Sequence, residues 1–157
     1  MNTRNIVTSL ITFVLFFAGC QSPSQSPKDD TISAMQALEH HAELRKAHQH
    51  TVITEDWGSL SWLAGKNIGN AEGLVLGRAK IKSGKTNPRH RHPKSEEVLY
   101  LLKGSLKHTL GDKMIIMHAG DTITIPPGVF HNASCISDED ADMIIVYSEG
   151  IRGFELE

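Results

Sequence analysis

Short hydrophobic stretches separated by glycine and proline run from residue 57 to the end of the chain. Within residues 73–82, for example, Arg78, Lys80 and Lys82 alternate with small or apolar residues. Alternation with a period of two is typical of a strand with one buried face. Similar stretches are 59–63, 97–102, 105–110, 113–118, 122–125, 142–147 and 153–156, and one more begins near His131. Short strands at this spacing predict an all-β sandwich or barrel.

The residues before these strands follow a helical pattern instead. Apolar residues recur at three- and four-residue steps between 31 and 50, and Asp30 or Thr31 can cap the segment. We therefore predict an α-helix over 31–50 that packs outside the domain or mediates self-association as a homodimer. The helix carries four histidines, His40, His41, His48 and His50. A polar, solvent-facing surface is a better interpretation of them than a second metal site.

The first twenty residues have the features of a targeting signal. The apolar run 6–18 has the length of a signal peptide rather than of a membrane span. It ends with small residues directly before Cys20, which resembles the lipobox of bacterial lipoproteins, where the cysteine is lipidated. The Ser-, Pro- and Gln-rich residues that follow predict a flexible tether. Gln21 follows this cysteine directly, and a residue of this kind at that position resembles lipoproteins that are sorted to the outer membrane. We therefore expect a lipid-anchored protein on the periplasmic side of the cell envelope.

Composition limits the classes of function. The 157 residues and the formal net charge of −2 fit one domain with a substantial core. No basic stripe with interleaved aromatic residues is present, which argues against nucleic-acid binding. The two cysteines, Cys20 and Cys135, give no disulfide framework. The predicted parts are a signal peptide (1–19), a tether (20–30), a helix (31–50) and a β-domain (51–157).

Candidate metal ligands lie within residues 84–104. His90 and His92 are two residues apart, so in a strand their side chains point to the same side. A turn predicted at 93–95 resets the alternation, which lets Glu97 face that side and leaves Glu96 facing away. Two imidazoles and a carboxylate that converge on one point suit a divalent metal. This stretch therefore predicts part of a metal site.

The same residues carry a resemblance to a known family. Cupin motif one is matched in spacing by Gly84, His90, His92, Glu97 and Gly104, and cupin motif two by Gly120, Pro126, Gly128 and His131. Both motifs occur in the family's order, and the resemblance implies a single-domain cupin, a jelly-roll β-barrel. Cys135 departs from the pattern, since Asn is usual there. We expect a buried, inert thiol at that position rather than a group at the site.

This resemblance implies one metal bound by His90, His92, Glu97 and His131. Three neutral imidazoles and one carboxylate suit Fe(II), Mn(II), Ni(II), Co(II) or Zn(II), and the sequence does not distinguish them. Four protein ligands leave positions open for substrate oxygens, water or dioxygen. Asn132 and His108 are candidates for a supporting role near the metal. For His108, an ordinary core or surface position is the better interpretation.

Two functions fit these features. The favoured one is a metal-dependent enzyme with dioxygenase-like oxidation of a small oxygenated substrate. The family also includes isomerases, epimerases and decarboxylases, and no residue selects among these reactions. The alternative is a non-catalytic cupin that binds a sugar, a phenolic compound or another small molecule. This alternative stays open because no general acid or base is evident beyond the ligands.

Replacing Cys20 by serine tests the lipid anchor. Because the lipid would be attached to this cysteine, Cys20→Ser should move the protein from the membrane fraction of cells to the soluble fraction. Ser22→Ala, two residues further along the tether, is the matched control and should stay with the membranes. A Cys20→Ser protein that still sediments with membranes would contradict anchoring through this residue.

Overall fold

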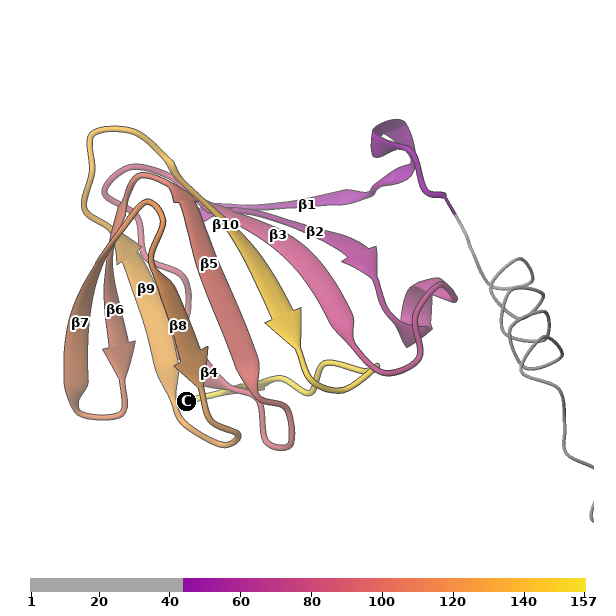
Figure 1. The fold of residues 1–157 in the computed structure, drawn as a ribbon. Helices are drawn as coiled ribbons and strands as arrows, with labels where there is room; N and C mark the ends of the chain where they lie inside the picture. Colours follow the sequence, from indigo (N-terminus) through magenta and orange to yellow (C-terminus); the bar gives the residue numbers. More distant parts are fainter. Residues whose placement is uncertain (1–43) are drawn as a thin grey trace, which may run out of the picture. The chain divides into compact units, whose positions relative to one another are not determined.

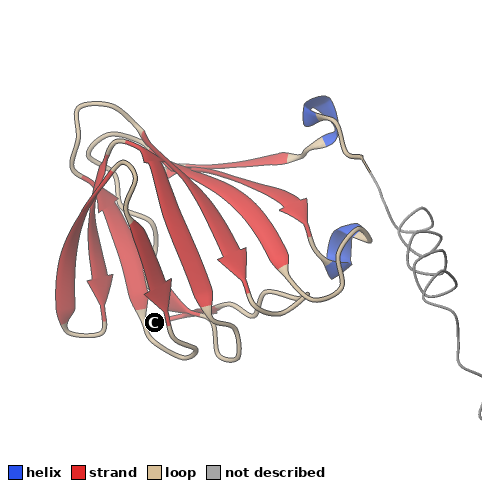
Figure 2. Cartoon of the chain, viewed as in Figure 1, coloured by secondary structure: helices blue, strands red, loops and turns tan. Residues whose placement is uncertain are grey.

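Two antiparallel β-sheets face each other in the computed structural model, which describes residues 44–157 (Figures 1 and 2). The first sheet has the order β1-β2-β3-β10-β5-β8, and the second has the order β11-β4-β9-β6-β7. The strands of the first sheet are β1 (Val52–Glu55), β2 (Gly58–Ala64), β3 (Val75–Ile81), β5 (Glu97–Lys103), β8 (Thr122–Ile125) and β10 (Ala141–Tyr147). Those of the second are β4 (His90–Arg91), β6 (Ser105–Leu110), β7 (Lys113–His118), β9 (His131–Cys135) and β11 (Glu155–Leu156). The all-β, jelly-roll prediction is thereby supported.

The inward faces of both sheets make the core. Buried and more exposed positions alternate along β3 and the first part of β5, as the sequence pattern predicted. Leu101 of β5 and Leu106 of β6 have no exposed surface, and Met143 and Tyr147 of β10 are each 2% exposed. Removal of these apolar side chains from water is the main force that holds the two sheets together.

The predicted α-helix over 31–50 is not supported. Residues 31–43 lie outside the described part of the chain, and residues 44–50 contain only the 3-10 turn Ala47–Gln49. The backbone is already extended at Lys46 and His50 on either side of this turn. The β-branched run 51–54 follows directly and pairs as β1 with β2, which overrides the helical pattern.

Other N-terminal predictions fall outside the described residues. These are the signal peptide, Cys20, the tether, His40 and His41. Within residues 44–157, no helix is long and apolar enough to span a membrane.

The strand predicted at 113–118 is more exposed than its sequence pattern suggests. Met114 and Ile116 alternate with other residues along 113–118, a pattern that predicts a barrel lining or a sheet interface. They are instead 63% and 49% exposed, and only Met117 of β7 is buried. The reason is that β7 lies at the edge of its sheet, with β6 as its only paired neighbour.

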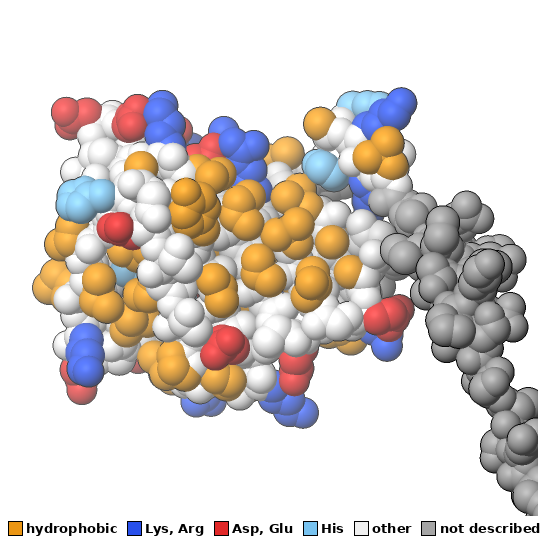
Figure 3. Space-filling view, viewed as in Figure 1, with side chains coloured by type: hydrophobic (Ala, Val, Ile, Leu, Met, Phe, Trp, Pro, Cys, Tyr) orange, Lys and Arg blue, Asp and Glu red, His pale blue; other side chains and the backbone are white. Residues whose placement is uncertain are grey.

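Apolar side chains also lie on the outer surface of the first sheet. Figure 3 shows them gathered where β5, β10 and β3 run, with charged side chains toward the margins. Tyr100 and Leu102 of β5 are each 43% exposed there.

A glycine corner brings the two sequence motifs together. Gly128 follows Pro126 and Pro127 and has a φ of +77°, a left-handed conformation that favours glycine. Its backbone N–H donates to the carbonyl oxygen of His92 at 2.8 Å. This bond connects the loop after β4 to the loop before β9, and so holds the two histidine-bearing segments side by side.

Glycine at position 58 is required by the close approach of β2 and β3. A Cβ atom added to Gly58 would lie 1.9 Å from the carbonyl oxygen of Lys80. Gly58→Ala should therefore lower the free energy of unfolding by about 1–3 kcal/mol or more, measured by denaturant titration. Gly73→Ala is the control, because nothing lies within 4 Å of its added Cβ, and it should change stability by no more than about 0.5 kcal/mol. Equal effects would contradict this packing of the two strands.

Candidate metal centre

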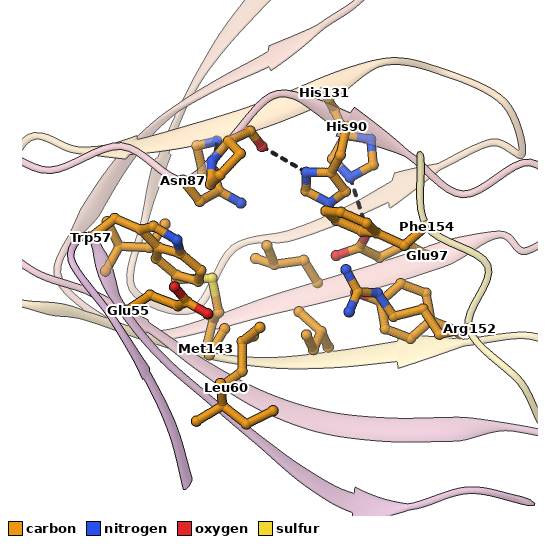
Figure 4. Close-up of a pocket in the computed structure, with 18 of the residues that line it drawn as sticks. Glu55, Trp57, Leu60, Asn87, His90, Glu97, His131, Met143, Arg152 and Phe154 are labelled. Carbon is orange, nitrogen blue, oxygen red and sulfur yellow. Dashed lines mark hydrogen bonds and ion pairs between the residues drawn. The ribbon is translucent and has the colours of Figure 1, made fainter. Parts of the chain in front are cut away.

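Three histidines and one glutamate meet between the two sheets. His90 on β4 is directly opposite His131 on β9, so their side chains are cross-strand neighbours. His92 follows β4 on the same side as His90, as predicted, and both are buried. Glu97 reaches the same point from β5 in the other sheet (Figure 4). Both sheets therefore contribute to one cluster.

The cluster has the size and burial of a metal site. One nitrogen from each of His90, His92 and His131 and one oxygen of Glu97 all lie within 4.8 Å of one another. The four residues are between 2% and 6% exposed. A metal bound at about 2.0–2.2 Å to each donor would bring opposite donors to about 4.4 Å or less. Small side-chain adjustments therefore suffice to close the set around one ion.

Hydrogen bonds orient all three imidazoles for metal binding. Each Nδ1 lies beside a backbone carbonyl oxygen: His90 beside Pro88 at 2.8 Å, His131 beside Val129 at 2.8 Å, and His92 beside Gly153 at 2.5 Å. A carbonyl only accepts, so each Nδ1 must carry a proton and donate it. In a neutral imidazole, Nε2 is then left with its lone pair. Such outer hydrogen bonds are the usual means by which proteins fix metal-binding histidines.

The contacts of Glu97 are stable only if a positive charge lies within the cluster. Its Oε2 atom lies 3.1 Å from Nε2 of His92 and 3.1 Å from Nε2 of His131. Nε2 of His92 is buried and has no hydrogen-bond partner among the described residues. Two imidazole lone pairs facing an anionic oxygen repel one another unless a proton or a metal ion lies between them. A divalent cation satisfies all of these atoms at once, so the residues present fit a metal.

The ionisation of the cluster also favours metal binding. Burial raises the pKa of Glu97, but His131 and His92 outweigh this effect and hold the pKa well below its ordinary value, so the carboxylate stays charged. Burial lowers the pKa of His90 to about 4. The neutral, metal-binding form of His90 therefore persists below the pH at which an ordinary histidine becomes protonated.

The cluster lies at the border of a cavity of about 430 Å³ between the sheets. This volume is within the range of small-molecule sites, about 300–1,000 Å³. Its walls are mostly apolar side chains from β2, β3, β5 and β10, and Figure 4 shows how they surround the open space beside His90, His131 and Glu97. Of the four residues, His90, Glu97 and His131 line this space and His92 does not, so an ion held by the four would be accessible from the cavity.

Two protic side chains border the cavity beside the cluster. His108 is buried, as preferred from the sequence, but it also lines the cavity and stacks on His131 with 5.8 Å between ring centroids. Its Nδ1 has no hydrogen-bond partner among the described residues, and burial lowers its pKa to about 4. Tyr147 lies opposite Glu97 in the next strand. Burial raises the pKa of Tyr147 well above its ordinary value, and Glu97 raises it further. Both side chains are therefore neutral near pH 7.

Other sequence candidates lie away from the cavity. Asn132 bonds through its side chain to Thr109 and to the backbone of Asn87. Glu96 is exposed, in agreement with the prediction from spacing. Cys135 is 2% exposed, and its sulfur lies near the backbone oxygen of Glu139 at 3.2 Å. The expectation of a buried thiol away from the site is confirmed.

Sequence reasoning missed three cavity residues near the cluster. Tyr147, Arg152 and Phe154 all line the cavity, and the ring of Phe154 lies 4.8 Å from that of His90 between centroids. Trp62 also lines the cavity. No sequence signal separates Arg152 from the other arginines, because its neighbours come from distant strands.

Comparisons with known proteins agree with this architecture. Residues 77–147 match the family model described as a cupin domain. The oxalate oxidase GF-3.8 of Triticum aestivum is 29% identical over 87 residues, which span 50% of this chain and 39% of the wheat protein. The chain thus spans about two fifths of that relative's length.

Solved structures share the fold. A recombinant oxalate oxidase in complex with glycolate matches with a TM-score of 0.60 and 22% identity, covering 66% of this chain and 56% of that one. The oxalate decarboxylase formate complex of Lactobacillus farciminis matches with a TM-score of 0.65 and 18% identity, covering 84% and 51%. The family match and the solved structures support a cupin fold. The buried group of His90, His92, Glu97 and His131 supports a divalent transition metal as the cofactor.

Paired substitutions test the four ligands. His131→Ala and Glu97→Gln should each weaken metal binding by more than about tenfold, because each removes a donor from a buried set. His118→Ala and Glu96→Gln are the matched controls, since both residues are exposed, and they should keep the metal content of the unmodified protein. The measurement is metal per chain by mass spectrometry after purification without added metal. Full metal content in both ligand variants would contradict the assignment.

Proposed function

We propose that this metal-binding cupin domain is a metal-dependent enzyme that oxidises a small oxygenated substrate in the cavity between its sheets. The observation that carries the proposal is the position of the cluster. Three of its four donor residues, His90, Glu97 and His131, line one end of a cavity of about 430 Å³, so the cluster is not enclosed by protein on all sides. A structural metal is usually enclosed by its ligands, whereas a catalytic metal keeps positions for substrate.

The proposed ligands of the metal are His90, His92, Glu97 and His131. When bound, the metal would polarise substrate oxygens and, if redox-active, supply electrons to dioxygen. The protein's part is to keep three imidazoles neutral and oriented through their Nδ1–H bonds. The apolar walls would exclude water from the bound substrate.

His108 and Tyr147 are the proposed proton-handling groups. Both border the cavity beside the cluster. A neutral imidazole donates at one ring nitrogen and accepts at the other, and the phenol of Tyr147 can donate. Their presence favours an enzyme over a simple binding protein, because the sequence alone offered no acid or base beyond the ligands.

The names of similar proteins suggest the substrate's chemical class. Oxalate, glycolate and formate, which appear in those names, are all small carboxylates. We propose that this chain also binds a carboxylate at its metal. The Cys20 lipid anchor and the tether, if present as predicted, would place this activity at the periplasmic face of the cell envelope.

Dioxygen uptake tests the enzyme against the binding protein. Protein loaded with Fe(II) or Mn(II) should consume dioxygen when supplied with a substrate from a panel of carboxylates, hydroxy acids and catechols. Uptake should fall at least about tenfold in Glu97→Gln and stay unchanged in Glu96→Gln. Calorimetric binding of panel members without uptake under either metal would instead support the non-catalytic alternative.

A further inference from the structure

Arg152 is a charged side chain in the cavity without an acidic partner. Its guanidinium carbon lies 4.9 Å from the ring centroid of Trp62, 5.6 Å from that of Tyr147 and 4.5 Å from that of Phe154. Its Nε atom is buried without a hydrogen-bond partner, and within residues 44–157 no carboxylate oxygen lies within 4 Å of the guanidinium. Other arginines of the described chain, such as Arg78, Arg89 and Arg91, do have such partners.

The aromatic contacts hold Arg152 in a fixed orientation near the metal cluster. Glu97 raises the pKa of Tyr147 and the guanidinium lowers it, so both charged groups lie close to the same hydroxyl. Figure 4 shows the guanidinium turned toward the cavity on the side of Glu97. A planar guanidinium fixed in this way presents two parallel N–H groups, the geometry that binds a carboxylate. Arg152 is partly buried, and an unpaired cation in such a position loses part of its hydration, a cost that an anionic ligand would offset.

The rest of the cavity has a different chemistry. Away from the cluster its walls are formed by the apolar side chains of Trp57, Leu60, Ile81, Leu99, Met143 and Ile145. Of the described lysines and arginines, only Arg152 lines the cavity. A two-carbon acid would occupy only a small part of about 430 Å³ and would leave these walls in contact with water.

The far side of the cavity carries a negative group. Glu55 of β1 lines the cavity beside Trp57, and Figure 4 shows it across the open space from Arg152. No cation lies within 4 Å of its carboxylate among the described residues. Glu55 is exposed, so water screens its charge in part, but on that side of the cavity it still opposes an anion at the end of a ligand far from Arg152.

From these contacts we propose that the ligand is a monocarboxylate with an aromatic or branched apolar body. Its carboxylate binds between the metal and Arg152, and its body lies against the apolar walls. This inference rests on the proposed metal site and narrows its substrate class. The proposed site differs from a site for a short dicarboxylate, because such a ligand would not contact the apolar walls and Glu55 would repel its second carboxylate.

Calorimetry with the Zn(II)-loaded full-length chain tests this inference through binding alone. Phenylacetate is the probe, acetate is the same carboxylate without the body, and 2-phenylethanol is a similar body without the charge. Phenylacetate should bind at least about tenfold more tightly than either of the other two, because it alone gains both the ionic contact and the apolar burial. Equal affinity for acetate and phenylacetate would overturn the inference, and so would equal affinity for phenylacetate and 2-phenylethanol.

Two substitutions locate the contacts. Arg152→Gln should weaken phenylacetate binding about 10- to 100-fold and leave 2-phenylethanol binding unchanged. Arg45→Gln, at an arginine outside the cavity lining, is the matched control and should bind phenylacetate normally.

Glu55→Gln should raise the affinity for 4-carboxyphenylacetate relative to that for phenylacetate, because it removes the repulsion at the far end. Unchanged phenylacetate binding in a folded Arg152→Gln protein contradicts the role of Arg152. If that variant does not fold, the three-probe comparison on the unmodified chain still decides.

The binding test of the ligand class and the dioxygen-uptake test of the proposed enzyme activity can fail independently. Selective phenylacetate binding without dioxygen uptake by any redox-active metal form would support this ligand class and reject the oxidation. Dioxygen uptake without a preference for phenylacetate would support the oxidation and reject this ligand class. If the unmodified protein does not bind added metal at all, both the ligand class and the proposed oxidation are rejected.

Discussion

Three Nδ1–H bonds to backbone carbonyls are the constraint on which the site depends. They fix the tautomer of His90, His92 and His131, and so turn three Nε2 lone pairs toward one point. Glu97 adds an anionic oxygen to the same point. Four electron-pair donors without a positive charge among them form an unstable arrangement inside a protein. The fold therefore binds a cation there, or must protonate a buried imidazole.

The two-sheet architecture explains why this cluster opens into a cavity. The histidines belong to segments of the second sheet, whereas Glu97 comes from the first. A metal would therefore tie the sheets together at one place. Beyond that place the sheets are separated by side chains that leave about 430 Å³ unfilled. A site that spans two layers thus combines a buried cluster of metal-binding groups with an open cavity, because the space between the layers is continuous with the cluster.

Local signals made much of the fold predictable, and long-range contacts account for what was not. The hairpin strands β6 and β7 have the predicted bounds because a glycine turn stands between them and the sequence alternates on both sides. The ligands His90, His92 and Glu97 followed from strand parity, whereas His131 depended on a motif. The exposure of Met114 did not follow, because alternation does not show that β7 lies at a sheet edge. Arg152 could not be found, because its aromatic neighbours come from β2, β10 and the C-terminal segment.

The C-terminal segment couples the metal ligands to the proposed substrate contact. Arg152 enters the cavity, the carbonyl of Gly153 accepts the Nδ1 proton of His92, and Phe154 lies against His90. The following strand β11 pairs with β4, and Arg91 forms an ion pair with Glu155 at 2.7 Å. One exposed ion pair contributes little stability by itself, about 0–1 kcal/mol. Its importance here is positional, because a shift of β11 along β4 would move the carbonyl that orients His92 together with the guanidinium. The orientation of His92 and His90 and the proposed carboxylate contact therefore depend on the same three consecutive residues.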